Sequence, residues 1–396
     1  MNQSDIAIIG GGISGLGLAH FCAKAGHNVR LFERDSQLGG ALQTHNTDGF
    51  WFELGGHTCY NSYETLIEIL HDLDLLKSVQ LRKREPFRIW YNGQFRSIFS
   101  QLNKIQLLRS LPRFLWARKD GQTVSTYYGN IAGKNNFGQV LSNVFNAVSS
   151  QTADEFPAEI LFKKRPRNKT LPRSFTLTNG LQSIAPSIVS HQKIEYKLSC
   201  EVTSLRRETD SYSIKTKDGA KYFSKQLALA TPPAIATQLL KEISPDLSKS
   251  LGHVRFVNVE SMAVVIESSN LKIEPMAGAI ARDEVFFSIV SRDVIPHEHL
   301  RGFTFHFAPD LLSHEEKICR IANLFDISQT TIKSIDEARH ILPCFRMGHY
   351  EWLAQTDQML DQTDLLLTGN YFSGMSIEDC LSRSKSQSFR LLQSQK

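Results

Sequence analysis

At 396 residues the chain is long enough for two or three domains, and its hydrophobic content of 41% is ordinary for a globular protein with a full core. The formal net charge of +5 is too small to indicate a nucleic-acid partner. The six cysteines are scattered without a CxxC or Cys/His cluster, which indicates neither a metal site nor a disulfide framework, and no apolar run reaches the roughly 18 residues of a membrane span.

The chain opens with the pattern of a strand, a glycine-rich turn and a helix. The run DIAII at 5–9 is β-branched, as in a buried parallel strand. Gly10, Gly12 and Gly15 follow in GxGxxG spacing, and LGLAHFCAKAG then predicts a helix. The run NVRLFER predicts a second strand that ends at Glu33.

Each position of this pattern has a physical reason. Gly10 permits a tight turn, Gly12 lets the backbone approach a pyrophosphate, and Gly15 lets the helix pack closely on the strand. The N–H groups and dipole at the helix start favour phosphates. Glu33, eighteen residues beyond Gly15, can accept hydrogen bonds from ribose hydroxyls. We therefore predict a dinucleotide site, with a plain βαβ unit as the alternative.

A second glycine pair distinguishes FAD from NAD. Gly39 and Gly40 follow the acidic residue, and DGFWFELGGHT occupies 48–58. This arrangement resembles a signature of the flavin-containing amine oxidase superfamily, in which the pair lies along the FAD and which NAD-dependent Rossmann enzymes usually lack. The superfamily typically has arginine where this chain has Gln37, and often a basic residue where it has Ala41. The resemblance implies non-covalent FAD held mainly by backbone groups.

Later segments extend the resemblance. In the superfamily, the match to FELGGHT (52–58) passes the flavin ring, and the match to CEVTSLRRE presents a backbone contact to adenine, here at Val202. Near the C-terminus, LLLTGNYFSGMSIEDCL predicts a buried strand, a turn and a helix start, with Ser376 and Asp379 as an S-x-x-D capping box. Free N–H groups at 375–377 would suit the negative charge that develops at flavin N1 and C2=O on reduction.

The motif and the resemblance together imply one set of cofactor-binding residues. They are Gly10, Gly11, Gly12, Ile13, Ser14, Gly15, Glu33, Arg34, Gly40, Ala41, Gly55, Gly56, His57, Thr58, Val202, Gly369, Met375, Ser376 and Ile377. Among them, His57 sits beside the expected flavin, but a histidine in a GGHT loop is more often structural than catalytic.

Within the superfamily the chain most resembles oxygen-dependent protoporphyrinogen oxidase. The matching pieces, in the family's order, are GGGISGL, LGGALQTHNTDGFWFELGGHT, RIWYNGQFRSI, FTLTNGLQSIAPSI, LALATPPAIATQLL and GNYFSGMSIEDCL. The last is the most specific to that family. The chain is shorter than typical members, and much of the shortfall falls between 280 and 345, where substrate contacts are expected.

The resemblance also suggests a substrate contact. Arg88 aligns with the family's arginine that pairs with a substrate propionate, a role that suits the planar guanidinium. The alternative is an arginine that is merely solvated on a polar hairpin. A set of phenylalanines with strand-like alternation could wall a flat apolar pocket, although core packing is the other interpretation for most of them. They are Phe286, Phe287, Phe303, Phe305 and Phe307.

The function implied is a FAD-dependent oxidase that takes a hydride from an activated C–H bond of a pyrrolic small molecule, with O2 or another electron acceptor. A related oxidase of an amine or a pyrroline-type ring is the first alternative. The absence of lysine between 273 and 316 disfavours a conventional amine oxidase of this superfamily, which often uses a lysine near flavin N5. The second alternative is a FAD-binding protein without catalysis.

We expect an α/β fold, in which a Rossmann-like (GR2-type) FAD domain is combined with a discontinuous α+β substrate domain and a helical cap. The expected segments are 1–75, 190–250 and 345–396 for the FAD domain, 76–190 for the cap, and 251–344 for the substrate-domain sheet.

Two basic clusters remain. LLRSLPRFLWARK at 107–119 interleaves apolar and basic residues, as in an interfacial helix on anionic lipid, or else is an ordinary helix of the cap. KKRPRNKTLPR at 163–173 predicts a solvated loop, with membrane contact or attraction of an anionic substrate as the alternatives. We therefore expect a cytoplasmic protein, with peripheral contact to the inner face of a membrane through the first cluster.

Overall fold

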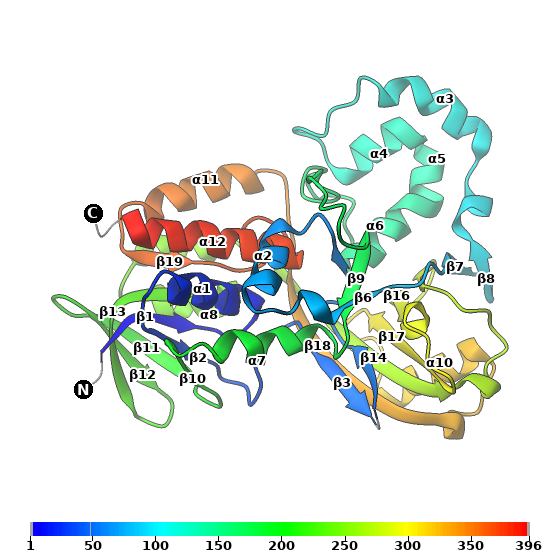
Figure 1. Ribbon diagram of the computed structural model, residues 1–396. Helices are drawn as coiled ribbons and strands as arrows, with labels where there is room; N and C mark the ends of the chain where they lie inside the picture. The colour runs from blue at the N-terminus through cyan, green and yellow to red at the C-terminus, as the bar shows by residue number, and fades with distance from the viewer. Residues whose placement is uncertain (1–2, 48, 394–396) are drawn as a thin grey trace.

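The computed structural model describes residues 3–47 and 49–393, which form two sheets with helices around them and a helical lobe to one side (Figure 1). Asp48 and the outer ends of the expected 1–75 and 345–396 segments lie outside this part. The first sheet has the order β10-β2-β1-β13-β12-β11, with β19 also paired to β13. Its strands are β1 (Ser4–Ile9), β2 (Val29–Phe32), β10 (Ile194–Lys197), β11 (Val202–Arg207), β12 (Tyr212–Thr216), β13 (Lys221–Leu229) and β19 (Leu365–Leu367).

Strand β1 lies between β2 and β13, and all three are parallel. The chain thus leaves β1 toward one neighbour and later returns on its other side. In open α/β sheets a ligand crevice forms outside the carboxyl ends of the strands at such a point. Here those ends are Ile9, Phe32 and Leu229. The sheet therefore positions a ligand next to the glycine turn that follows Ile9.

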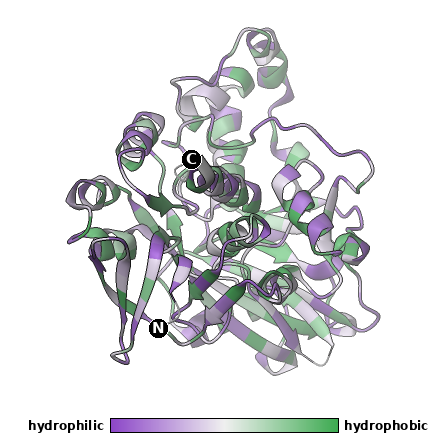
Figure 2. Cartoon of the chain, turned by 60° about the vertical axis from the view of Figure 1, so that its left-hand side comes forward, coloured by the Kyte–Doolittle hydropathy of each residue, from purple (hydrophilic) through white to green (hydrophobic). Residues whose placement is uncertain are grey.

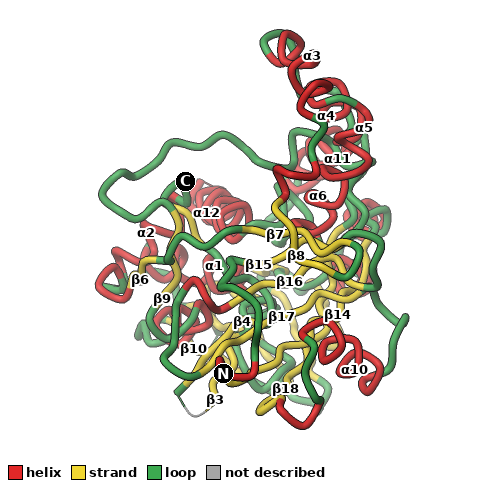
Figure 3. Tube along the Cα trace, turned by 90° about the vertical axis from the view of Figure 1, so that its right-hand side faces the viewer, coloured by secondary structure: helices red, strands yellow, loops and turns green. Residues whose placement is uncertain are grey.

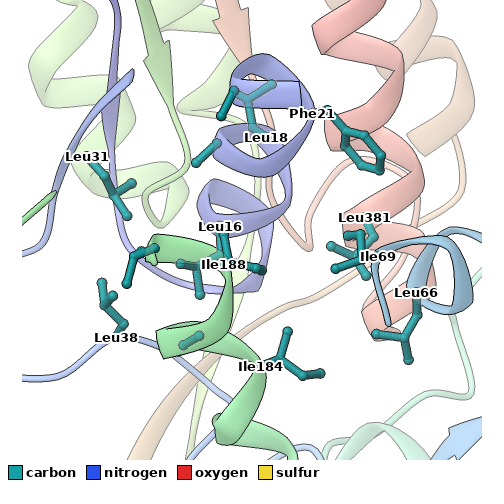
Figure 4. Close-up of a cluster of buried hydrophobic side chains, with 14 of the residues drawn as sticks. Leu16, Leu18, Phe21, Leu31, Leu38, Leu66, Ile69, Ile184, Ile188 and Leu381 are labelled. Carbon is teal, nitrogen blue, oxygen red and sulfur yellow. The ribbon is translucent and has the colours of Figure 1, made fainter. Parts of the chain in front are cut away.

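Side chains of β1 alternate between two cores. Ile6 and Ile8 pack with α1, α7 and α12, whereas Ala7 and Ile9 pack with residues of α8, α9 and α11. Figure 4 shows the first core, where Leu16 of α1 and Ile188 of α7 converge. The helices are α1 (Ile13–Lys24), α2 (Glu64–Asp72), α7 (Ile184–Val189), α8 (Pro233–Leu240), α9 (Pro245–Leu251), α11 (His349–Leu360) and α12 (Ile377–Gln393).

The second sheet has the order β18-β14-β17-β16-β15-β7-β8, and α10 (His314–Phe325) covers one face. Its strands are β7 (Phe87–Tyr91), β8 (Gln94–Ser97), β14 (Phe256–Glu267), β15 (Gly278–Ala281), β16 (Phe286–Ser291), β17 (Leu300–Phe307) and β18 (Ile332–Pro343). Phe303, Phe305 and Phe307 pack under α10, and Phe286 joins them. Core packing is thus their role, while Phe287 is only partly buried.

The expected cap at 76–190 requires a correction, because only its middle forms the helical lobe. The lobe contains α3 (Lys104–Phe114), α4 (Val124–Ala132), α5 (Lys134–Asn136), the π-helical turn η3 (Phe137–Leu141) and α6 (Ser142–Ser149). Figure 3 shows it projecting from the body. Strands β7 and β8 instead extend the second sheet, since Asn92 and Gly93, both at positive φ, make the tight turn of a hairpin. At the other end of the range, α7 packs on α1.

Two small sheets connect the larger ones. One pairs β3 (Thr44–Thr47) with β4 (Phe50–Glu53), and the other has the order β5-β9-β6, with β5 (Cys59–Tyr60), β6 (Val79–Leu81) and β9 (Ser174–Leu177). Hydrophobic residues follow the buried strands, and the surrounding helices carry both hydrophobic and hydrophilic residues (Figure 2). Across residues 3–47 and 49–393, no helix has the length and apolar character needed to cross a bilayer.

Candidate functional site

The glycine turn after β1 has the geometry of an anion site. Gly10 has φ +108°, and a side chain there would overlap the Ala230 carbonyl. Helix α1 then begins at Ile13, with Gly12 as an N-cap that has no side-chain hydrogen bond and with no acidic residue in the first turn. The N–H groups of Ile13 and its two successors, Ser14 and Gly15, are therefore left for a ligand.

Glu33 lies at the end of β2 beside this turn. Its Oε2 accepts a hydrogen bond from Gly11 N at 2.6 Å, and its Oε1 accepts one from Asp35 N at 2.9 Å. Cys200 N donates to Glu33 O at 2.8 Å, which sets the start of β11 and hence Val202 close by. The side chain of Val202 itself is buried in the core. Arg34, in contrast, is exposed, and among the described residues its one ionic partner is Asp35, at 3.6 Å.

The second glycine pair contacts the first turn directly. Gly39 N donates to Gly11 O at 2.9 Å. A Cβ on Gly40 would lie 2.9 Å from Gly12 Cα, whereas a Cβ on Gly12 would meet nothing closer than Gly40 Cα at 3.7 Å. Ala41 O in turn accepts from Gly56 N at 3.1 Å. Residues 10–15, 39–41 and 55–58 therefore form one continuous backbone surface.

The C-terminal turn forms the predicted capping box. Asp379 N donates to Ser376 Oγ at 3.1 Å, and Ser376 N donates to Asp379 Oδ2 at 3.2 Å. The expectation of free N–H groups throughout 375–377 needs a correction, because this second bond uses the N–H of Ser376. Met375 and Ile377 keep theirs free of partners within the described chain. Gly369, before the turn, packs against the ring of Tyr371.

The basic segment at 163–173 is a largely exposed loop, as its composition predicts, but two of its cations are bound and not merely solvated. Lys163 Nζ lies 2.8 Å and Arg165 Nη2 2.7 Å from Asp379 Oδ1, and Lys163 also donates to Ser373 O. Asp379 thus caps α12 with one carboxylate oxygen and binds two cations with the other. The segment fastens the end of the lobe to the C-terminal turn.

Two buried histidines, His306 and His340, and the partly buried His57 lie together at the 54–57 loop. His57 Nδ1 is 3.2 Å from Gly55 O, and its ring centroid is 6.4 Å from that of His306. His306 Nδ1 is 3.0 Å from Ser261 Oγ, and His340 Nε2 is 3.0 Å from Leu54 O. This cluster was not predicted. The sequence does carry a signal for it in the strand FTFHF (303–307). The three phenylalanines alternate with Thr304 and His306, so His306 must point to the face of β17 opposite the phenylalanine core.

These imidazoles are neutral at physiological pH. Burial, with help from the nearby Arg82, lowers the pKa of His57 to about 4. Burial and the neighbouring His57 and His340 lower the pKa of His306 to about 3. Burial also lowers the pKa of His340. Each ring can therefore donate or accept a hydrogen bond without bringing a charge into the site, and no group of three or more metal-ligating side chains occurs in the described residues.

Arg88 does not join this site. It lies in β7, where its register partner is Ala279 of β15. Paired residues of adjacent strands point to the same face, and Ala279 belongs to the core under α10. His306 and Thr304 lie on the opposite face, against 53–57. The expected role of Arg88 as substrate anchor is thus at odds with the sheet register.

Three comparisons with known proteins bear on this geometry. A family model described as an NAD(P)-binding Rossmann-like domain matches residues 8–73. The "probable flavin-containing monoamine oxidase A" of Dictyostelium discoideum is 23% identical over 269 residues, 59% of each chain. The 15-cis-phytoene desaturase of Synechococcus elongatus is 33% identical over 76 residues, 19% of this chain and 16% of that one.

Solved structures cover the whole chain. The crystal structure of "Putative protoporphyrinogen oxidase" from Exiguobacterium sp. 255-15 matches with a TM-score of 0.80, 17% identity and 100% of both chains. Putrescine oxidase matches with a TM-score of 0.74, 15% identity and 99% of both chains. The chain resembles the flavin-containing amine oxidase superfamily. The predicted α/β class with a Rossmann-like domain is confirmed. The chain matches these curated relatives over less than two thirds of their own length.

FAD of this superfamily fits the residues present. The room at Gly12 and the unpartnered N–H groups of the first turn of α1 suit a pyrophosphate. The hydroxyl of Thr231 is buried and has no hydrogen-bond partner within the described chain. Thr231 adjoins the glycine turn, because its backbone N would lie only 3.2 Å from a Cβ placed on Gly10. Gln37 and Ala41 supply no cation, so phosphate binding here would depend on backbone groups.

The neutral histidines predict an acid-dependent loss of stability. In the unfolded chain each imidazole titrates near its ordinary pKa of 6.5, whereas His57 and His306 in the folded protein stay neutral to about pH 4 and 3. The stabilisation is therefore fully present above pH 6.5 and declines as the pH falls toward the folded pKa values. Replacing one ring by a neutral side chain, as in His306→Asn, should lower the slope of unfolding free energy against pH by about 1.4 kcal/mol per unit.

Urea unfolding at a series of pH values between about 4 and 6.5 measures this slope. The exposed His299 gives the matched control, because His299→Asn removes an imidazole that stays in water. If both variants changed the slope equally, the assignment of a buried neutral imidazole to His306 would be wrong.

Proposed function

We propose that the chain is a FAD-dependent oxidase that takes a hydride from an activated C–H bond of a pyrrolic substrate, as in protoporphyrinogen oxidation. The observation that carries the proposal is the contact between the starts of α1 and α12. Ser384 Oγ donates to Ser14 O at 2.7 Å, and Leu381 packs on Gly17. One extended cofactor can therefore reach from the pyrophosphate turn along 39–41 and 55–58 to the C-terminal turn.

The residues take separate tasks in this proposal. The N–H groups at 13–15 would hold the pyrophosphate, Glu33 the ribose, and the backbone at Val202 the adenine. FAD, when bound, supplies a two-electron acceptor. The N–H groups of Met375 and Ile377 would stabilise the negative charge that grows at the flavin pyrimidine. The substrate loses one hydride and one proton in each cycle, and O2 takes up two electrons and two protons as hydrogen peroxide.

Oxidation of an amine or a pyrroline-type ring is the second candidate. The Dictyostelium relative and putrescine oxidase bear names of amine oxidases. The chain has no lysine between 273 and 316, and the residue of β17 that faces the 54–57 loop is the neutral His306. A FAD-binding protein without catalysis is the third candidate, and the changed residues Gln37 and Ala41 are its sole support.

Cofactor binding can be separated from folding at Gly12. A Cβ there would make an ordinary 3.7 Å contact with Gly40, so Gly12→Ala should fold with an unchanged melting temperature in the apo state. The added methyl fills the space needed for the pyrophosphate, and we expect FAD affinity to fall at least tenfold, as measured by flavin absorbance after reconstitution. The control is Gly26→Ala, where nothing lies within 4 Å but φ is +100°, so only stability should fall. A Gly12→Ala protein that binds FAD as tightly as the unaltered protein would contradict the assignment.

Substrate class is tested by comparing a porphyrinogen with amines. Purified holoprotein should convert protoporphyrinogen to fluorescent porphyrin faster than autoxidation and release peroxide in the same assay. Bleaching of the flavin by an amine or a pyrroline, without porphyrin formation, would favour the second candidate. A flavin that none of these compounds bleaches would favour the third. The Gly12→Ala protein controls for oxidation that does not depend on bound FAD.

We further propose that the lobe contacts an anionic membrane surface through α3. The helix and the two residues after it expose a set of large apolar side chains, with Trp116 at 86% exposure. The others are Ile105, Leu107, Leu108, Phe114 and Leu115. Arg109, Arg113 and Arg118 lie exposed among them. Apolar side chains flanked by arginines are complementary to anionic lipid, and Figure 1 places α3 at the tip of the lobe.

Vesicle binding tests this contact. The protein should sediment with vesicles that contain phosphatidylglycerol and much less with pure phosphatidylcholine, and about 1 M salt should weaken the binding by screening the arginines. Trp116→Ser should reduce binding about tenfold, because it removes the most exposed apolar side chain. Phe389→Ser, at an exposed site on α12, is the control. Equal binding to both lipids, or no binding, would contradict the proposal.

A further inference from the structure

A small cavity lies next to the histidine cluster, between β4, β9 and the second sheet. Its volume is about 30 Å³, which is room for one or two water molecules. The polar side chains in its wall are those of Glu53, His57, Arg82, Thr176, Ser291, Arg292 and Thr304. His57 therefore has the cavity on one side and the 54–56 loop on the other.

The cavity wall carries more positive than negative charge. Arg82 Nη1 donates to Thr58 Oγ1 at 2.6 Å, and Arg292 Nε donates to Trp51 O at 2.9 Å. Neither guanidinium has a carboxylate within 4.0 Å among the described residues, and burial lowers the pKa of both. Both residues are partly buried, and a partly buried arginine that lines a cavity without a carboxylate partner marks a candidate ligand site.

Glu53 offsets this positive charge only in part, through its attraction to Arg292. Its two oxygens already accept hydrogen bonds from Leu181 N at 2.7 Å and from Thr44 Oγ1 at 2.7 Å. Burial raises the pKa of this carboxyl to about 7, so the group is partly protonated near neutral pH. Arg292 stacks over Trp51, with its guanidinium carbon 4.1 Å from the ring, which leaves Arg82 as the less engaged cation.

An unpartnered hydroxyl supplies an independent sign of a ligand. Thr176 is 2% exposed, and its Oγ1 has no hydrogen-bond partner within the described part of the chain. It lines the same cavity as Arg82. Buried hydroxyls are almost always hydrogen-bonded, so a group that occupies this space should accept a bond from Thr176.

We propose that this cavity is an anion subsite that receives a carboxylate of the substrate, with Arg82 as the cation and Thr176 as a hydrogen-bond donor. The space suits a planar carboxylate better than a tetrahedral phosphate, and a guanidinium fork matches its two oxygens. The inference rests on the proposed oxidase, because the cavity is a substrate subsite only if 54–58 passes the flavin. It selects carboxylated substrates over simple amines and places their anchor at Arg82 and not at Arg88.

Benzoate and its neutral analogue benzamide probe the subsite in purified holoprotein. Calorimetric titration should show tighter binding of benzoate than of benzamide. Arg82→Met should weaken benzoate about tenfold or more and leave benzamide unchanged, since a charge-assisted hydrogen bond is lost. Arg88→Met removes an arginine from the other face of the sheet and should leave both ligands unaffected.

Thr176→Val keeps the test informative if Arg82→Met fails to fold. The substitution replaces an unpartnered buried hydroxyl by a methyl, so the melting temperature should stay or rise while benzoate affinity falls about threefold or more. Equal affinity for both ligands in the unaltered protein would overturn the subsite, as would a loss of benzoate binding in Arg88→Met alone. A yellow protein without benzoate preference refutes only the subsite, whereas a protein that binds no FAD refutes the oxidase.

Discussion

The packing of α12 on α1 is the contact on which the remaining arrangement depends. Gly17 makes the close approach possible, because any side chain there would overlap Leu381. Ser384 then fixes the pair through the Ser14 carbonyl, across 370 residues of sequence. With this contact in place, the first turn of α1 and the start of α12 lie close together. A ligand much longer than a nucleotide can then be held at both ends by backbone groups.

Acidic residues at the start of α12 make this geometry rigid. Glu378 is buried, and its carboxylate accepts hydrogen bonds from Thr65 N at 2.9 Å and Leu66 N at 3.1 Å, which caps α2. Asp379, the next residue, caps α12 itself and binds Lys163 and Arg165. Two adjacent carboxylates thus join the N-terminal segment, the lobe and the C-terminal helix. Because each is fully hydrogen-bonded, burial of these groups specifies one arrangement of the three segments.

The sequence predicts those parts of the site that depend on interactions between residues close together in the chain. The GxGxxG turn and the Ser376–Asp379 box each lie within one turn of backbone, so residue type and spacing determine them. Arg88 shows the limit: its face of the sheet depends on pairing with β15, and β15 comes from a distant segment. For the same reason, the sequence does not predict the ion pair between Lys163 and Asp379 or the contact between His57 and His306, since each joins distant segments. The composition of 163–173 predicted that Lys163 would be solvated, and not that it would bind Asp379.

Charge in the proposed subsite depends on His57 being neutral. Its ring adjoins Arg82, and a protonated imidazole there would add a second positive charge beside the guanidinium. Burial and Arg82 both oppose that protonation, so the pKa falls to about 4. The positive charge near a bound anion therefore comes from the arginines, which stay protonated near neutral pH. Glu53 reduces it to an extent that depends on pH, because its carboxyl has a pKa of about 7. A neutral imidazole between the cavity and the 54–56 loop can thus offer a hydrogen bond to a bound anion, while charge recognition in the proposed subsite stays at Arg82.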